Sequence, residues 1–202
     1  MRRKLNIGII PDGNRRWARK HNASWTTAYE LGATIAANLV SGARHEGSVG
    51  RIVFYALSQE DFRNRPPAQV EAILAGVRRF FDLVRNFQGV LVKCYGYYWH
   101  EKIAPLMSAV PPQKGEHVIE VDLLLNYSAE QEYNGHVGSL PIPPLDMVIK
   151  TGGGRNLAGF LPRQSSNADL FFLDVLWQDF NLQSFLGCLE RHRVEMSRVP
   201  GI

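Results

Sequence analysis

Two short stretches of the chain hold the residues best suited to chemistry. The first, PDGNRRW at residues 11–17, directly follows the apolar run of residues 7–10. A glycine lets the backbone turn tightly toward a ligand, the N–H groups of a helix start suit a phosphate, and Arg15 and Arg16 add bidentate donors. Asp12 fits beside an anion if Mg²⁺ bridges the carboxylate and phosphate oxygens. The stretch therefore predicts a magnesium and phosphate site, with an ordinary Asp-Gly turn as the alternative.

The second stretch, KTGGGRN at residues 150–156, follows another β-rich run. Its three consecutive glycines, flanked by Lys150 and Arg155, resemble an anion-binding nest of backbone N–H groups. A flexible surface loop is the alternative interpretation. Two phosphate-like sites on one small chain predict two phosphorylated substrates.

Alternating β-rich and helical segments would position both stretches. Short β-rich runs occupy residues 5–10, 51–57, 90–95, 118–125 and 146–150, whereas residues 28–47, 66–84 and 182–196 have helical patterns. This alternation predicts an α/β fold, in which a largely parallel central sheet is flanked by helices in a single domain over residues 1–202. Ligands in such folds bind beyond the carboxyl ends of the strands, where both stretches lie.

Composition limits the classes of function. The 202 residues are 45% hydrophobic, which is enough for one sizeable core. The net charge of +4 suits an anionic partner, but the basic residues are scattered, which favours phosphorylated small molecules over nucleic acid. Cys94 and Cys188 have no metal-site spacing and indicate thiols of a reducing, cytoplasmic location. The first apolar run ends at Pro11 after four residues, and no segment approaches the length for membrane insertion.

Three regions resemble the signature regions of the cis-prenyltransferases, the undecaprenyl diphosphate synthase family. They are IIPDGNRRWA at residues 9–18, FYALSQEDFRNRP at residues 54–66, and the span from DMVIKTGGGRN to ADLFFLDVLWQDF at residues 146–180. The resemblance implies a homodimeric α/β enzyme with Mg²⁺. Such a prenyltransferase joins an allylic diphosphate to a second C5 diphosphate above a hydrophobic tunnel.

The resemblance also implies roles for residues of the first site. Asp12 matches the family's catalytic, magnesium-binding aspartate, and Asp169 stands where the family has a glutamate that helps bind the metal. The loop that holds the allylic diphosphate is matched by Gly13, Asn14, Arg15 and Arg16. Trp25 and Tyr29 replace the usual arginine and histidine, and either steady a cation or simply pack.

The second substrate site departs further from the family pattern. Ser58 matches the serine of the family's SxEN stretch and is a candidate catalytic residue, whereas Phe62 replaces a tryptophan. Two arginines and a serine that grip isopentenyl diphosphate in the family are replaced by Lys150, Asn156 and Ala158. Because lysine and arginine do not hold phosphate with the same geometry, the second diphosphate must sit differently. We expect it on Ser58, Phe62, Lys150, Arg155, Asn156 and Arg163, although Arg163 would equally suit a surface charge.

The tunnel is expected to be short. Phe80 and Phe81 lie on the helix that lines it in the family, and the segment after Asn126 is shorter than the family's by about a helix. Both features argue against long-chain products.

These features most resemble the branch that makes irregular monoterpenes, the lavandulyl and cyclolavandulyl diphosphate synthases. The prediction is a Mg²⁺-dependent, head-to-middle condensation of two dimethylallyl diphosphates into a C10 diphosphate, with cyclisation left open. The base is the released diphosphate, Asn14 or Ser58. A regular short-chain synthase that uses isopentenyl diphosphate is the alternative. A non-catalytic partner subunit is a third interpretation, against which the retained Asp12 argues.

Overall fold

The core of the protein is a six-stranded parallel sheet. The computed structural model describes residues 3–97, 100–134 and 140–198. The strand order is β3-β4-β2-β1-β5-β6, and each neighbouring pair runs parallel. The strands are β1 (Leu5–Ile10), β2 (Val49–Ser58), β3 (Gln88–Tyr95), β4 (Lys114–Tyr127), β5 (Met147–Lys150) and β6 (Asp169–Phe172). The predicted α/β fold is confirmed, and β6 adds a strand that the pattern analysis did not predict.

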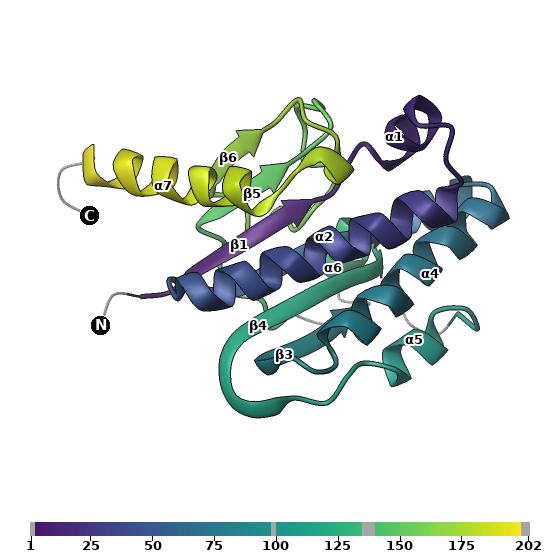
Figure 1. Ribbon diagram of the computed structural model, residues 1–202, viewed down its shortest axis with the longest axis horizontal. Coiled ribbons are helices and arrows are strands. Elements are labelled where there is room, and N and C mark those ends of the chain that lie inside the picture. Colours follow the sequence, from purple (N-terminus) through teal and green to yellow (C-terminus); the bar gives the residue numbers. More distant parts are fainter. Residues whose placement is uncertain (1–2, 98–99, 135–139, 199–202) are drawn as a thin grey trace.

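Three long helices cover one face of the sheet (Figure 1). They are α2 (Trp25–Glu46), α4 (Pro67–Val84) and α7 (Leu182–Arg198). Helix α2 begins where the Ser24 side chain accepts a hydrogen bond from Thr27 N, at 3.0 Å, and it ends at Gly47 with φ of 87°. Gly76 lets α4 pack closely on α2, because a Cβ there would lie 2.9 Å from the Tyr29 carbonyl oxygen.

Short elements connect this framework. They are α1 (Asn14–Lys20), α3 (Gln59–Asn64), α5 (Ala104–Ser108), α6 (Ala129–Tyr133) and the 3-10 helix η1 (Trp177–Asp179). On the second face of the sheet, Val53, Leu124 and Val148 pack against apolar residues of the connections. Those connection residues are Leu140, Ile142, Leu145, Phe160 and Leu161. The sheet is therefore covered by helices on one side and largely by irregular chain on the other.

A buried charged network lies on the same face of β2, β3 and β4. Arg51 forms ion pairs with Asp122 and, at 2.7 Å, with Glu120, which also pairs with Lys93. The Asp122 side chain has no exposed surface, and its Oδ1 has no hydrogen-bond partner among the described residues. Burial raises the pKa of Asp122 to about 6, although the charge of Arg51 opposes this shift.

This raised pKa predicts a pH-dependent stability. Because the folded-state pKa exceeds the unfolded value, the contribution of Asp122 is fully present below about pH 4 and is lost as the pH rises through about 6. The stability of the parent minus that of Asp122→Asn should therefore fall by roughly 2–3 kcal/mol between pH 4 and pH 7. Urea unfolding at several pH values measures it. A constant difference for Asp122→Asn across this pH range would contradict the prediction.

Candidate active site

A cavity of about 570 Å³ opens at the carboxyl edge of the sheet, between the strand ends and helices α2 and α4. Its wall includes Pro11 just beyond β1, Ser58 at the end of β2 and Lys150 at the end of β5. This volume is within the usual range of small-ligand pockets. The cavity lies where ligands bind in parallel sheets.

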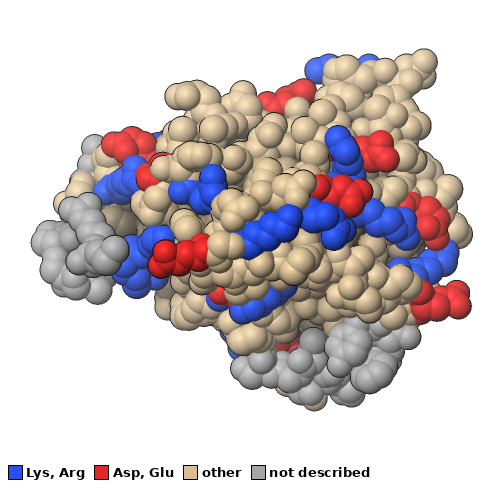
Figure 2. Space-filling model, turned by 60° about the horizontal axis from the view of Figure 1, so that its bottom comes forward, with Lys and Arg blue, Asp and Glu red and all other residues tan. Residues whose placement is uncertain are grey.

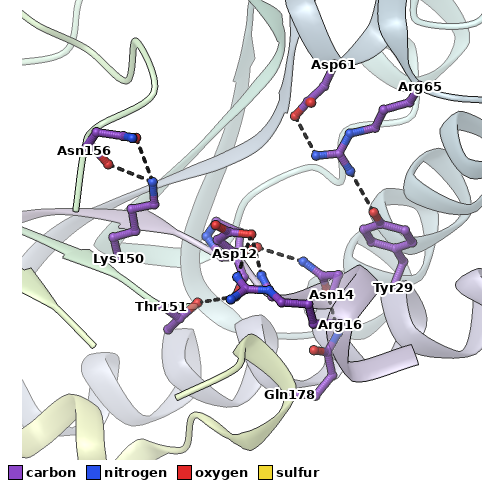
Figure 3. Close-up of polar contacts among 12 residues, drawn as sticks. Asp12, Asn14, Arg16, Tyr29, Asp61, Arg65, Lys150, Thr151, Asn156 and Gln178 are labelled. Atoms are coloured by element: carbon purple, nitrogen blue, oxygen red, sulfur yellow. Dashed lines mark hydrogen bonds and ion pairs between the residues drawn. The ribbon is translucent and has the colours of Figure 1, made fainter. Parts of the chain in front are cut away.

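The two glycine-containing stretches are in direct contact at this edge (Figure 3). Thr151 Oγ1 donates a hydrogen bond to the Asp12 carbonyl oxygen at 2.8 Å, and Trp177 N donates to the same oxygen at 3.1 Å. Gly152 has φ of 83°, and a Cβ there would lie 2.9 Å from the backbone carbonyl carbon of Asp12. Only glycine fits this approach, which explains why the second stretch needs one here.

Asp12 presents a carboxylate to the cavity. Its Oδ1 accepts a hydrogen bond from Gly13 N at 2.6 Å and lies 3.6 Å from Nη2 of Arg16. Among the described residues, no cluster of three or more His, Cys, Asp or Glu side chains could hold a metal. A single half-exposed carboxylate nevertheless suits Mg²⁺, which usually takes one or two carboxylates and completes its shell with phosphate oxygens and water.

Lys150 supplies the cation of the second stretch. Its Nζ donates to the backbone oxygen and to Oδ1 of Asn156, at 2.7 and 3.0 Å. Burial lowers the pKa of Lys150, and the negative charge of Asp12 partly offsets that effect. A Cβ on Gly154 would lie 3.1 Å from Nζ, so glycine leaves the ammonium group room.

A third polar cluster comes from α2, α3 and α4 (Figure 3). The hydroxyl oxygen of Tyr29 accepts hydrogen bonds from Nη1 of Arg65 and from Nε2 of Gln69, both at 2.9 Å. Arg65 Nη2 also donates to Asp61 at 2.7 Å. Burial lowers the pKa of Arg65, but the hydrogen bonds and charges of Asp61 and Tyr29 together outweigh it, so the pKa rises and the guanidinium stays charged.

The wall therefore combines a cationic mouth with an apolar floor. Five cationic side chains face two carboxylates, Asp12 and Asp61; the cations are Arg15, Arg16, Arg19, Arg65 and Lys150. Phe54 contributes to the floor, and its ring centroid lies 6.1 Å from that of Phe80 and 6.4 Å from that of Trp177. A polyanionic head group with a short apolar tail matches this division.

On the outer face drawn in Figure 2, Lys and Arg residues alternate with Asp and Glu residues and form no continuous basic tract. None of the described helices is long and apolar enough to span a membrane. The concentration of cations at the cavity mouth contrasts with this mixed surface.

Comparisons with known proteins agree with this geometry. A family model described as "Putative undecaprenyl diphosphate synthase" matches residues 10–135 and 84–199, which together span most of the chain. The chain belongs to this cis-prenyltransferase family. It is an enzyme that transfers prenyl groups.

Named relatives place the prenyltransferase among isoprenoid enzymes. It is 26% identical to a di-trans,poly-cis-undecaprenyl-diphosphate synthase of Giardia intestinalis, over 98% of this chain and 89% of the relative. It is 28% identical to the Escherichia coli undecaprenyl-diphosphate synthase, over 91% and 85% of the two chains. Lavandulyl diphosphate synthase from Lavandula x intermedia, solved with dimethylallyl diphosphate, has the same fold, with a TM-score of 0.77, 19% identity and 94% coverage of both chains.

Most residues predicted for the first site of the prenyltransferase do line the cavity. They are Asp12, Gly13, Asn14, Arg15, Arg16 and Tyr29. Ser58 also lines it, and its Oγ accepts a hydrogen bond from Asp61 N at 2.9 Å, which caps α3. Trp25 is exposed at the start of α2, away from the cavity wall.

The predicted pairing of Asp12 with Asp169 at a metal does not form within one chain. Asp169 begins β6 and is in register with Met147, which is in register with Ile7. Asp12 lies beyond the other end of β1, and the Asp169 carboxylate instead contacts Nδ1 of His192 at 2.5 Å. In a parallel sheet, a residue that begins one strand and a residue that follows the end of another lie at opposite ends of the strands. The motifs do not show where a strand begins or ends, so they did not reveal this separation.

The predicted second substrate site is only partly assembled. Ser58 and Lys150 line the cavity, while Asn156 lies behind Lys150 and holds it. Arg155 is mostly exposed and faces Asp174 at 3.7 Å, and Arg163 stacks on the ring of Tyr133 at 4.7 Å. Phe62 packs edge-on against His100, with ring centroids 4.6 Å apart. Each of these three side chains has a local partner outside the cavity, so sequence proximity to the motifs was misleading.

Several site residues were not predicted. Arg65 is the last arginine of the motif FYALSQEDFRNRP, so its signal was present in the sequence, whereas Arg19 is the next cation after Arg16 on α1 and lies just beyond the motif IIPDGNRRWA. Gln178 had no such signal. Its Nε2 donates hydrogen bonds to Asn14 Oδ1 at 2.6 Å and to the Ala28 carbonyl oxygen at 2.9 Å.

Proposed function

We propose that this prenyltransferase condenses two dimethylallyl diphosphates, head to middle, into a C10 diphosphate of the lavandulyl type. The observation that carries the proposal is Lys150, because a single lysine held by Asn156 occupies the place where the family grips isopentenyl diphosphate with arginines. Lysine acts on phosphate as a compact point charge rather than a bidentate fork. The lysine can therefore hold a second diphosphate in an orientation that differs from the one held by the family's arginines.

The size of the cavity supports a short product. Phe54, Phe80 and Trp177 close the apolar floor, and Phe81, the second predicted lining residue, is buried in the core instead. The dimethylallyl diphosphate complex of the lavandulyl diphosphate synthase with the same fold also supports a C5 allylic substrate.

The residues of the cavity suit the bond changes of this reaction. The C1–O bond of one dimethylallyl diphosphate breaks, and the cationic mouth stabilises the departing diphosphate. The C2 atom of the second molecule attacks C1, and the resulting tertiary cation loses a methyl proton to the released diphosphate, which gives the lavandulyl skeleton. The apolar floor shelters both cations from water. Mg²⁺, which Asp12 would hold, supplies further neutralisation of the diphosphate when bound. Reprotonation and ring closure would give the cyclolavandulyl product.

One incubation tests the proposal. The protein with Mg²⁺ and dimethylallyl diphosphate alone should yield a C10 diphosphate, which mass spectrometry detects after phosphatase treatment. Chromatography against open-chain and cyclic standards separates the two C10 outcomes. Turnover only after isopentenyl diphosphate is added would overturn the proposal in favour of a regular short-chain synthase. A homodimer and a cytoplasmic location stay predictions.

A further inference from the structure

Asn14 belongs to a chain of hydrogen bonds that links α2, η1 and α1 to the end of β1 (Figure 3). Gln178 Nε2, beside α2, donates to the Ala28 carbonyl oxygen at 2.9 Å and to Asn14 Oδ1 at 2.6 Å. Asn14 Nδ2 in turn donates to the Pro11 carbonyl oxygen at 2.7 Å. The chain therefore runs from α2 through η1 and α1 to the end of β1.

The two ends of this chain fix the orientation of both side-chain amides. A backbone carbonyl oxygen only accepts hydrogen bonds, so the atom facing Ala28 O must be the nitrogen of Gln178. The same nitrogen faces Asn14, whose contacting atom must then be its oxygen, and this leaves the Asn14 nitrogen for Pro11 O. A flipped amide at either residue would place two donors or two acceptors against each other.

The Asn14 side chain has one N–H group available for a ligand. Both hydrogens of Gln178 Nε2 have acceptors, whereas Asn14 Nδ2 uses only one of its two among the residues that the structure describes. Asn14 lines the cavity, so its remaining N–H is available to a ligand there. Its Oδ1 already accepts a hydrogen bond from Gln178, so Asn14 meets a ligand with its remaining N–H as a donor.

The Gln178 side chain does not satisfy all of its own polar atoms within the described part of the chain. Its side chain is almost fully buried, and its Oε1 has no hydrogen-bond partner among the described residues. An unpaired buried oxygen costs stability and calls for an explanation. The explanation is that Gln178 fixes the orientation of the Asn14 amide. Binding sites commonly contain supporting residues that hold a site residue in one rotamer.

We propose that Gln178 is a positioning residue that holds the Asn14 amide so that its free N–H meets a diphosphate oxygen in the cavity. The inference rests on the proposed function only in taking an allylic diphosphate as the ligand. It does not depend on which C5 diphosphate is the second substrate.

A double-mutant cycle tests this role. Gln178→Leu should lower kcat for diphosphate release about tenfold, because Asn14 loses the donor that orients its amide. In an Asn14→Ala background the same change should cost less than twofold, since Gln178 acts through Asn14. Gln183→Leu, at an exposed glutamine of α7, should match the parent. Parental activity of Gln178→Leu, or additive losses in the cycle, would overturn the proposal.

A binding measurement separates positioning from activity. On titration with Mg²⁺ and inorganic diphosphate, the side-chain NH₂ resonances of Asn14 should shift in the parent and shift less in Gln178→Leu. Equal shifts in both proteins would contradict the proposal. The kinetic measurements use whichever second substrate the parent turns over. If that substrate is not dimethylallyl diphosphate, the proposed function is wrong, but the test of Gln178 remains valid.

Discussion

Replacing Asp12 with asparagine should lower the rate of diphosphate release by about 100- to 1,000-fold. Asparagine keeps the shape of the side chain and an oxygen that can accept the Gly13 N–H bond. It loses the charge that would hold Mg²⁺ and that lies 3.6 Å from Nη2 of Arg16. The expected loss therefore reflects weaker stabilisation of the departing diphosphate rather than unfolding.

Release of diphosphate from dimethylallyl diphosphate is the measurement, with circular dichroism to confirm the fold. The concentration of Mg²⁺ at half-maximal rate should also rise. Asp174→Asn is a matched control, because that exposed carboxylate faces Arg155 at 3.7 Å and lies outside the cavity wall, yet its loss changes the net charge equally. An Asp12→Asn protein within threefold of the parent would show that the carboxylate has no part in ionisation.

The sequence was most informative where backbone periodicity determines position. The β-rich run at residues 5–10 coincides with β1, and the run at residues 146–150 ends with β5 at Lys150. Because carboxyl ends of parallel strands share one edge, it follows that Asp12 and Lys150 approach each other. A resemblance of motifs was not needed for that step.

The sequence was least informative about side-chain direction and contacts between distant segments. Arg155 and Arg163 are close in sequence to the glycine stretch, but their side chains contact Asp174 and Tyr133. No local sequence pattern predicts those contacts. β6 was missed because a four-residue strand with mixed burial has little periodicity. Gln178 lies 164 residues from Asn14, so their contact exists only in the folded chain.

Lys150→Met should lower kcat/KM for the second substrate about 100-fold, since a hydrogen bond to a charged group contributes roughly 1.5–3 kcal/mol. Methionine has a similar unbranched side chain and tolerates burial, so the loss isolates the ammonium group. Arg163→Met removes the same charge from the stack on Tyr133, outside the cavity wall, and should stay within twofold of the parent.

Steady-state kinetics of the two variants distinguish the alternatives for the second site. Equal losses of kcat/KM in the two variants would show that Arg163 also binds the second substrate, as expected from the sequence. A large loss only in Arg163→Met would show that Lys150 does not hold the second diphosphate.

The pH dependence gives an independent check. Because burial lowers the pKa of Lys150, the parent should lose affinity for the second substrate as alkaline pH neutralises the ammonium group. Lys150→Met has no such group and should lack this alkaline rise in KM. A parallel rise in both proteins would assign the titration to another residue.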